Sequence, residues 1–173
     1  YDIYKRYADG EMYDADSIKV DSTAAYKTVA GRTVYGGGGI IPDVFVPVDT
    51  TRATKFFIAC NKKATQMRFA SAMFDKYKSR LSEIDSDAEL GIFLDRMNIP
   101  SAFREYASSK DGITCTQKEW EETSEYLLPQ LRALVGRYSK LGENAFYKMY
   151  LNVDVTLKKA IESDSRNLLH PAR

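Results

Sequence analysis

The chain has very little histidine and cysteine. Of its 173 residues, one is histidine, His170, and two are cysteine, Cys60 and Cys115. Histidine-rich zinc sites are therefore excluded, and Ser-His-Asp or Cys-His catalysis would have to use His170, near the last residue. The two cysteines are too far apart for a disulfide framework, and neither belongs to a Cys-x-x-Cys pair. We expect unpaired thiols, no metal site and no cofactor.

The sequence also lacks a charge imbalance and a long apolar run. Its 25 basic and 24 acidic residues give a formal net charge of +1, so no global field attracts nucleic acid or an anionic membrane. It has no run of about 18 apolar residues, and residues 1–6 contain neither an initiating Met nor an apolar signal core. We expect no membrane span and no nucleic-acid partner, and we expect the chain to be a piece of a longer protein.

The sequence does contain enough apolar material for one sizeable core. Hydrophobic residues make up 44% of the chain, and domains of this size bury roughly 70% of the surface of the unfolded chain. We predict an α+β fold that is predominantly helical. Residues 1–49 should form a short helix, a hairpin, a Gly-rich crossing and a final strand, and residues 50–173 should form a helical domain.

Strand signals are confined to the first part of the chain. Apolar residues at helical spacing in 3–8, followed by Gly10, predict a short helix with a glycine stop. The β-branched and aromatic residues of 25–29 and 32–35 flank a turn at 30–31 and predict a hairpin.

Helical signals dominate after Asp49. A capping box, in which a hydroxyl and a carboxylate each take one free amide, is predicted at 86–89 and again at 116–119. Pro100 should start a short helix, and Pro129 predicts a kink in the helix that follows the second box. Two apolar stripes at 3.6-residue spacing mark further helices. The first stripe is Ala70, Met73, Phe74, Tyr77 and Leu81, and the second is Phe146, Met149, Tyr150, Val153, Leu157 and Ile161, followed by a polar tail from Ser163.

Four consecutive glycines, Gly36 to Gly39, are the most unusual local feature. A phosphate-binding loop would need a Lys followed by Ser or Thr and then a helix, but residues 40–42 are Ile-Ile-Pro. The alternative is a bulged crossing where another backbone passes close. The apolar run 44–47 then predicts a final strand that ends near Val48.

The segment around these glycines resembles part of a known family. It contains Tyr26-Lys27-Thr28, Gly31-Arg32-Thr33-Val34-Tyr35, the glycine run, Gly39-Ile40-Ile41-Pro42-Asp43 and then Pro47-x-Asp49-Thr50-Thr51. This string resembles the end of the peptidase core in carboxy-terminal processing (tail-specific) serine peptidases, where a Gly-Arg hairpin leads through a Gly-rich crossing to a Gly-Ile-x-Pro-Asp turn and a final strand. The match covers about twenty residues tightly, and the flanking helices more loosely resemble the long-tailed, Bacteroides-like type.

The resemblance implies that the chemistry lies outside this chain. Family members use a serine nucleophile activated by a lysine, and a PDZ-like domain that captures the substrate by strand addition. All of these precede the Gly-Arg hairpin in the family, so no catalytic residue is assigned here. The implied partners are the upstream catalytic and PDZ portion, protein or peptide substrates of the whole protease, and further copies of the chain. The implied location is the bacterial cell envelope, in the periplasm.

Local serine and lysine neighbours do not provide a substitute dyad. Ser17 with Lys19 and Ser139 with Lys140 are adjacent or nearly so, and such neighbours do not face each other on a helix. A solvated lysine, with a pKa near 10.4, is also a poor base. The acidic pairs Glu121-Glu122 and Asp85-Asp87 are more typical of solvated faces and caps.

Two other functions remain open from the residues alone. The chain could be an independent helical interaction module whose Gly-rich hairpin is only a turn. It could also be a small-ligand domain that uses Gly36 to Gly39, which would require a shaped pocket or a bound anion beside them. Under any of these functions, the recurring aromatic residues at helical spacing are first expected in the core. If the catalytic body is missing, however, the fragment should expose a larger apolar patch than an ordinary monomer.

Overall fold

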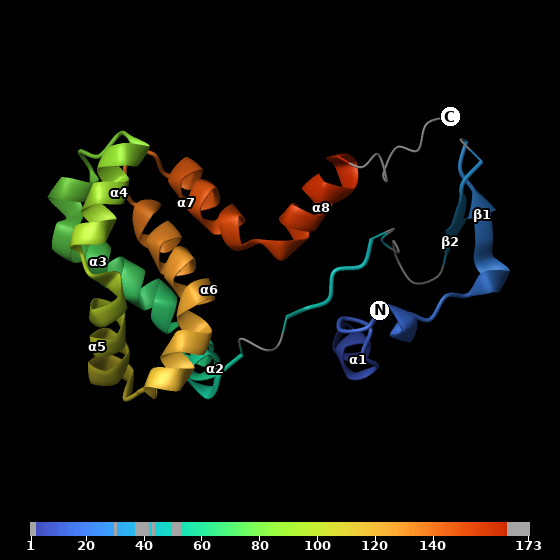
Figure 1. Cartoon of the computed structure of the whole chain (residues 1–173), viewed down its shortest axis with the longest axis horizontal. Helices are drawn as coiled ribbons and strands as arrows, with labels where there is room; N and C mark the ends of the chain where they lie inside the picture. The colour runs from blue at the N-terminus through green and yellow to red at the C-terminus, as the bar shows by residue number, and fades with distance from the viewer. Residues whose placement is uncertain (1–2, 30, 37–41, 43, 50–52, 166–173) are drawn as a thin grey trace. The chain divides into compact units, whose positions relative to one another are not determined.

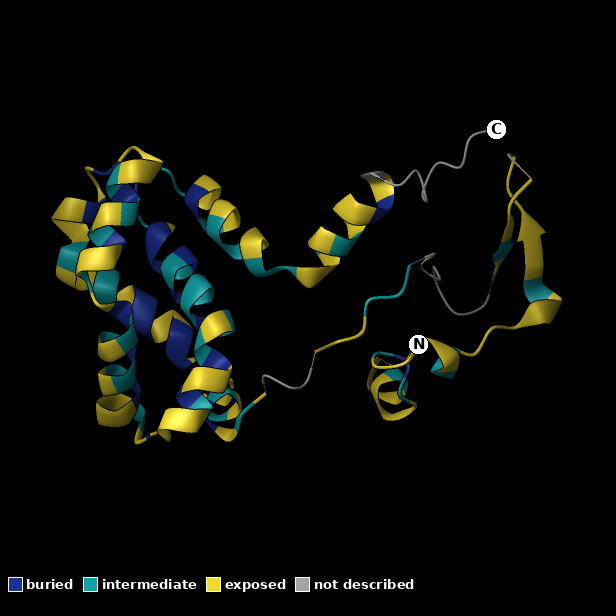
Figure 2. Ribbon diagram, viewed as in Figure 1, coloured by how far each residue is buried: buried dark blue, intermediate teal, exposed yellow. Residues whose placement is uncertain are grey.

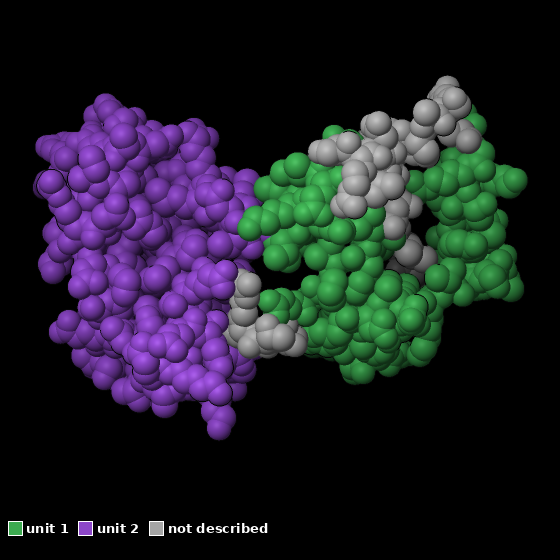
Figure 3. All heavy atoms as spheres, viewed as in Figure 1, with its two compact units in different colours: residues 1–49, 155–173 green, residues 50–154 purple. Residues whose placement is uncertain are grey.

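The computed structural model describes residues 3–29, 31–36, 42, 44–49 and 53–165. These residues form eight α-helices, three short 3-10 helices and one two-stranded antiparallel sheet (Figure 1). The predicted α+β, predominantly helical fold is confirmed. The chain divides into two compact units, residues 50–154 and residues 1–49 with 155–173 (Figure 3). One boundary follows Asp49. The last helix groups with residues 1–49 in what we call the first unit, and residues 50–154 form the second unit.

The first unit begins with the predicted short helix. Helix α1 spans Ile3–Ala8, and Gly10 follows with φ of +85°, a conformation that glycine adopts without a side-chain clash. Two 3-10 turns follow, η1 (Ala15–Ser17) and η2 (Ser22–Ala24). Each is capped by an aspartate carboxylate that accepts a backbone amide proton two residues ahead. Helix α8, Val155–Ser165, belongs to the same unit.

The predicted hairpin is present in a shorter form. Strands β1 (Ala25–Lys27) and β2 (Thr33–Tyr35) pair in antiparallel register, with Tyr26 opposite Val34. The turn is closed by the Gly31 amide, which donates to the Thr28 carbonyl at 2.9 Å. Gly31 has a φ of +81°, so glycine suits this position.

The predicted final strand is wrong. Residues 44–49 form no strand, and the backbone bond found there joins the Val48 amide to the Met12 carbonyl at 2.9 Å. A strand needs a neighbouring strand to hydrogen-bond with, and the described sheet contains only β1 and β2. The Gly-rich crossing was predicted at Gly36 to Gly39 and the turn after it at Gly39 to Asp43, and of these residues only Gly36 and Pro42 are described.

The second unit is a bundle built around one central helix. Its helices are α2 (Lys55–Lys62), α3 (Thr65–Leu81), α4 (Asp87–Arg96), α5 (Ile99–Asp111), α6 (Gln117–Gly136) and α7 (Glu143–Tyr150), followed by η3 (Leu151–Val153). Helix α6 contacts each of the other five α-helices, and its buried side chains Leu127, Leu131 and Val135 lie in the core. None of the described helices is long and apolar enough to cross a bilayer.

Aromatic side chains join the helices of this bundle. Phe103 of α5 makes edge contacts with Phe69 of α3 at 5.3 Å and with Phe56 of α2 at 6.2 Å between ring centroids. Phe56 also meets Trp120 of α6 at 6.2 Å. Edge-to-face pairs of this kind add to the stabilisation from area burial. Four helices therefore share one aromatic cluster in the core.

The two predicted capping boxes differ in the structure. At the start of α6, Thr116 accepts the Glu119 amide proton, and the Glu119 carboxylate accepts the Thr116 amide proton at 3.0 Å, so this box is confirmed. At the start of α4, Ser86 caps the Glu89 amide, but the Glu89 carboxylate binds Arg80 of α3 instead. The box at 86–89 is therefore only half formed.

The backbone at Pro129 and the last helical segment also differ from what the sequence predicts. Helix α6 continues through Pro129, whereas the non-helical backbone inside a helix lies at Tyr77 in α3. The apolar stripe from Phe146 to Ile161 was predicted as one helical segment. The structure divides it into α7, η3 and α8, because Asp154 takes an extended conformation with φ of −75° and ψ of 104°. The polar tail was predicted from Ser163, but α8 continues to Ser165, and residues 166–173 lie outside the described residues.

Acid should weaken the second unit through Asp111. Its side chain is 4% exposed and binds Arg68 at 2.6 Å and the Thr65 hydroxyl at 2.6 Å. The Arg68 guanidinium, and then Thr65, hold the pKa of Asp111 below its ordinary value. A lowered pKa gives stability that is full above the ordinary carboxyl pKa of about 4 and is lost as the pH falls through the lowered value.

Asp111→Asn should therefore lower stability at neutral pH and reduce the further loss on acidification. Urea unfolding at about pH 7 and about pH 3 measures both effects. Asp95→Asn serves as the control, because Asp95 pairs with Arg132 on the surface and is 70% exposed. An acid response of Asp111→Asn equal to that of the unsubstituted chain would contradict this assignment.

Candidate functional site

Residues 3–49 have almost no core of their own among the described positions. No hydrophobic side chain is buried there, and the buried residue in this range is Glu11, which pairs with Arg6 at 2.8 Å. Tyr4 and Tyr26 are 80% and 63% exposed. In Figure 2 both strands of the hairpin are largely exposed, whereas the helices of the second unit carry buried faces. This stretch therefore presents apolar and aromatic surface without covering it.

The hairpin also leaves the outer side of each strand without a described partner strand. The sheet consists of β1 and β2 alone, and a strand edge offers backbone groups to which another strand can pair. Gly36 follows β2, where a Cβ atom would lie 3.0 Å from the Tyr26 ring. The first glycine of the run thus lets the Tyr26 side chain lie against the backbone after β2.

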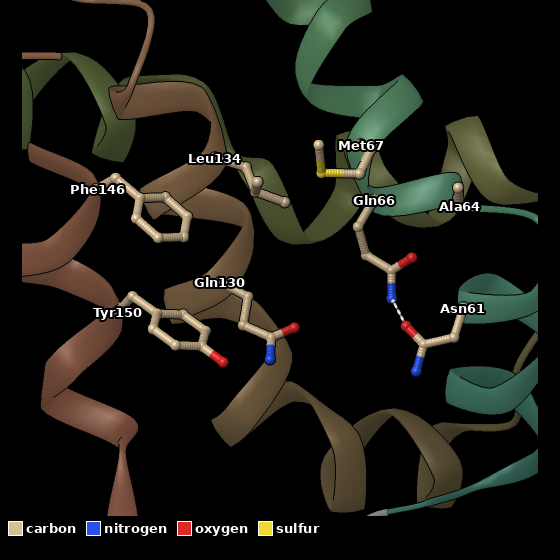
Figure 4. Close-up of a pocket in the computed structure, with 8 residues that line it drawn as sticks. All are labelled: Asn61, Ala64, Gln66, Met67, Gln130, Leu134, Phe146 and Tyr150. Carbon is tan, nitrogen blue, oxygen red and sulfur yellow. Dashed lines mark hydrogen bonds between the residues drawn. The ribbon is translucent and has the colours of Figure 1, made fainter. Parts of the chain in front are cut away.

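A hollow of about 340 Å³ opens on the second unit between α2, α3, α6 and α7 (Figure 4). It is lined by Asn61, Ala64, Gln66, Met67, Gln130, Leu134, Phe146 and Tyr150. None of these side chains is a carboxylate, an ammonium or a guanidinium. The hollow therefore suits an uncharged group and offers no ordinary acid–base pair.

Polar and apolar groups occupy different sides of this hollow. In Figure 4, Leu134, Met67 and Phe146 lie on one side, and the carboxamides with the Tyr150 hydroxyl lie on the other. Gln66 donates to Asn61 Oδ1 at 2.7 Å. Burial raises the pKa of Tyr126, and the charge and hydrogen bond of the neighbouring Tyr150 raise it further. Tyr126 therefore remains a neutral hydrogen-bonding group near neutral pH.

Sequence reasoning did not identify this hollow. Phe146 and Tyr150 were expected on a core face, and they lie at its rim with intermediate exposure. Asn61, Gln66 and Gln130 are scattered polar residues in three helices, and no spacing rule brings them together. These residues come together only because their helices pack against one another.

The serine and lysine neighbours considered above have other partners. Lys19 Nζ lies 3.3 Å from Asp9 Oδ2. The Ser139 hydroxyl donates to the Gly136 carbonyl at 2.7 Å and accepts the Leu141 amide proton, so it helps to end α6. Within the described residues neither serine is hydrogen-bonded to a lysine.

The acidic neighbours also bind basic or polar residues. The Glu121 carboxylate accepts a hydrogen bond from Gln117 Nε2 at 2.9 Å, and Asp87 pairs with Lys148 at 2.5 Å. Glu122 pairs with Lys118 one helical turn away. No cluster of three or more potential metal ligands occurs in the described part of the chain, and His170 lies outside that part.

The two cysteines are free thiols in unequal surroundings. Cys60 is fully buried, whereas Cys115 is partly exposed. Burial raises the pKa of the Cys60 thiol to about 11, and burial also raises the pKa of Cys115. The thiolate is the reacting form, so a raised pKa and burial both slow alkylation.

Iodoacetamide should therefore label Cys115 first in the folded protein. Cys60 should react at a comparable rate only after unfolding in urea. Mass spectrometry of the two cysteine-containing peptides over time measures both rates, and Cys60→Ser gives the reference for Cys115 alone. Equal labelling of the two thiols without denaturant would show that Cys60 is accessible.

Comparisons with protein-family models, with curated proteins and with solved structures found no match for this chain.

Proposed function

We propose that the chain is the C-terminal part of a carboxy-terminal processing serine peptidase, in which it completes and braces the catalytic body. Residues 1–49 would supply the end of the peptidase core, and the helical unit would follow it as an appended domain. The serine nucleophile and its lysine would come from the upstream portion. The chain by itself would then hydrolyse nothing, and its place would be the periplasm.

The observation that carries this proposal is the uncovered hairpin. A two-stranded hairpin is at best marginally stable in water unless more strands or a helix cover it. Here β1 is exposed along its whole length, and no described apolar side chain in residues 3–49 is buried. Segments with aromatic residues and so little burial are typical of pieces that pack against another body. Residues 26–43 resemble the end of a peptidase core, so we take the catalytic body of a peptidase as the body against which the hairpin packs.

The helical unit supports the second half of the proposal. It buries three phenylalanines, Trp120 and a set of aliphatic residues in one core, so it does not need the hairpin in order to fold. A self-sufficient unit joined to an incomplete one fits a domain appended to a catalytic core.

The helical unit also favours one alternative. An uncharged hollow of about 340 Å³ on a well-packed bundle is compatible with an independent module that binds a protein segment. In that case the hairpin would have no larger body to complete. The coding sequence upstream of Tyr1 separates the two proposals. A serine followed about one helix later by a lysine supports the peptidase, whereas a start codon close by supports the module.

The biochemical test uses the chain and the separately produced upstream portion. Light scattering of the mixture should show a complex, and Tyr26→Ala with Tyr35→Ala should weaken it at least tenfold. Tyr147→Ala is the matched control, because Tyr147 is a 53% exposed tyrosine of the helical unit. A strictly monomeric chain with no affinity for the upstream portion would overturn the proposal.

Activity gives a second test. The purified chain should leave an unstructured protein such as casein intact. Cleavage that disappears when one serine of the chain is replaced would place a nucleophile here and contradict the proposal.

A further inference from the structure

Arg104 of α5 has no acidic partner among the residues that the structure describes. Its guanidinium lies over the Trp120 ring of α6, with Cζ 5.0 Å from the ring centroid. Other arginines of the helical unit are paired, as Arg68 is with Asp111 and Arg132 with Asp95. No described carboxylate forms an ion pair or hydrogen bond with Arg104. The stack on Trp120 fixes the plane of the guanidinium while its charge stays uncompensated.

The Nε atom of Arg104 is also buried without a hydrogen-bond partner. It is the one such side-chain atom found among the described residues that are not exposed. Buried donors in folded proteins are nearly always satisfied, so an orphan donor calls for an explanation. An acceptor supplied by a ligand or by water would remove the cost of leaving it unpaired.

A hollow of about 320 Å³ lies beside this arginine. It is lined by Phe56, Arg104, Glu105, Ser108, Ile113, Thr114 and Cys115. A water molecule takes about 30 Å³ of the liquid, so there is room for a group of several non-hydrogen atoms. Phe56 and Ile113 provide apolar wall, and the hydroxyls of Ser108 and Thr114 can donate hydrogen bonds.

The charges around the hollow favour a single negative charge on its ligand. Arg104 supplies one positive charge, and its planar fork matches the two oxygens of a carboxylate. Glu105 also lines the hollow, and it would repel a dianion more than a monoanion. The apolar wall fits a short hydrocarbon portion next to the charged end.

We propose that the hollow beside Arg104 binds the carboxylate of a small amphiphilic monocarboxylate, held by the guanidinium with its apolar portion against Phe56 and Ile113. The hydroxyls of Ser108 and Thr114 complete the donor set. This site is independent of the proposed peptidase role, since all of its residues belong to the helical unit.

Trp120 provides the measurement, because it is the chain's single tryptophan and contacts Arg104 directly. Butyrate added to the chain at constant ionic strength should give a saturable change in Trp120 emission. Butyramide, which lacks the charge, should give none, and inorganic phosphate should bind at least tenfold more weakly. Butyrate should also slow alkylation of Cys115, which lines the hollow.

Arg104→Gln should abolish the butyrate response, while Arg132→Gln, which alters an arginine outside this hollow, should leave it unchanged. Thr114→Val, at an exposed position, should weaken binding about threefold or more without disturbing the fold, which circular dichroism checks. The proposal is overturned by an unsaturable response, by an equal response to butyramide or phosphate, or by full binding in Arg104→Gln. An unchanged affinity for butyrate in Thr114→Val would show that the Thr114 hydroxyl does not bind the ligand.

Discussion

Replacing Phe103 with alanine should lower the free energy of unfolding by about 3–5 kcal/mol, the usual cost of removing a fully buried phenylalanine. Phe103 is completely buried and is the ring that joins Phe56 and Phe69, so its loss leaves a cavity between three helices. Domains are commonly stable by about 5–15 kcal/mol, so this single change removes a large share. Urea unfolding followed by Trp120 emission measures it.

A surface substitution gives the reference for this effect. Ile92 is 55% exposed on α4, and Ile92→Ala should change stability by no more than about 0.5 kcal/mol. Both variants should unfold in one cooperative transition. A loss below about 1 kcal/mol in Phe103→Ala would mean that the aromatic cluster is not the centre of the core.

Replacing Gly136 with leucine should be the other severe change. Gly136 is buried near the end of α6, where an added Cβ would lie 3.2 Å from Leu90 Cδ2, 3.6 Å from Met149 Sδ and 3.7 Å from Ala145 Cβ. A leucine side chain must displace α4 or α7 from α6. Overpacking of this kind costs about 1–3 kcal/mol or more, and thermal unfolding followed by circular dichroism measures it.

Gly91 is the matched control for this substitution. It also lies in a helix, α4, but an added Cβ there would have no atom within 4 Å apart from its chain neighbours and the backbone of its own helix. Gly91→Leu should therefore stabilise the chain by about 0.5–1 kcal/mol, because leucine has a higher helix propensity than glycine. If both substitutions changed stability in the same direction, the result would contradict the close packing of α4 and α7 against Gly136.

Local sequence signals predicted the elements whose causes are local. The glycine at position 10 ends α1, and Thr116 with Glu119 starts α6, because each acts within one turn of the backbone. The Ser86 signal was only half right, because Arg80 of another helix offers Glu89 a full positive charge in place of a backbone amide. Tertiary contacts thus redirected a side chain that local rules had assigned.

The errors share one physical origin. The run at 44–47 has the residues of a strand, but strand formation requires a partner that the described sheet does not supply. Likewise, Asp154 interrupts a stripe of apolar residues whose spacing gave no sign of a break. Both features depend on what surrounds the segment, which residue spacing does not specify.

The candidate sites were the least predictable part. Asn61, Gln66 and Gln130 are unremarkable in sequence, and their shared hollow arises from the packing of four helices. Arg104 is similar, because its role depends on the Trp120 ring, sixteen residues away, and on the lack of a described carboxylate that is bonded to it. Such sites depend on tertiary packing that pattern rules do not resolve.

Amide hydrogen exchange of the chain, alone and with the upstream portion, tests most directly whether the hairpin belongs to a larger body. Alone, the amides of β1 and β2 should exchange nearly as fast as those of an unstructured peptide, while the core amides of α6 remain strongly protected. With the upstream portion present, the hairpin amides should become protected while α6 is unchanged. Hairpin protection equal to that of α6 in the chain alone, or no gain on mixing, would contradict the account.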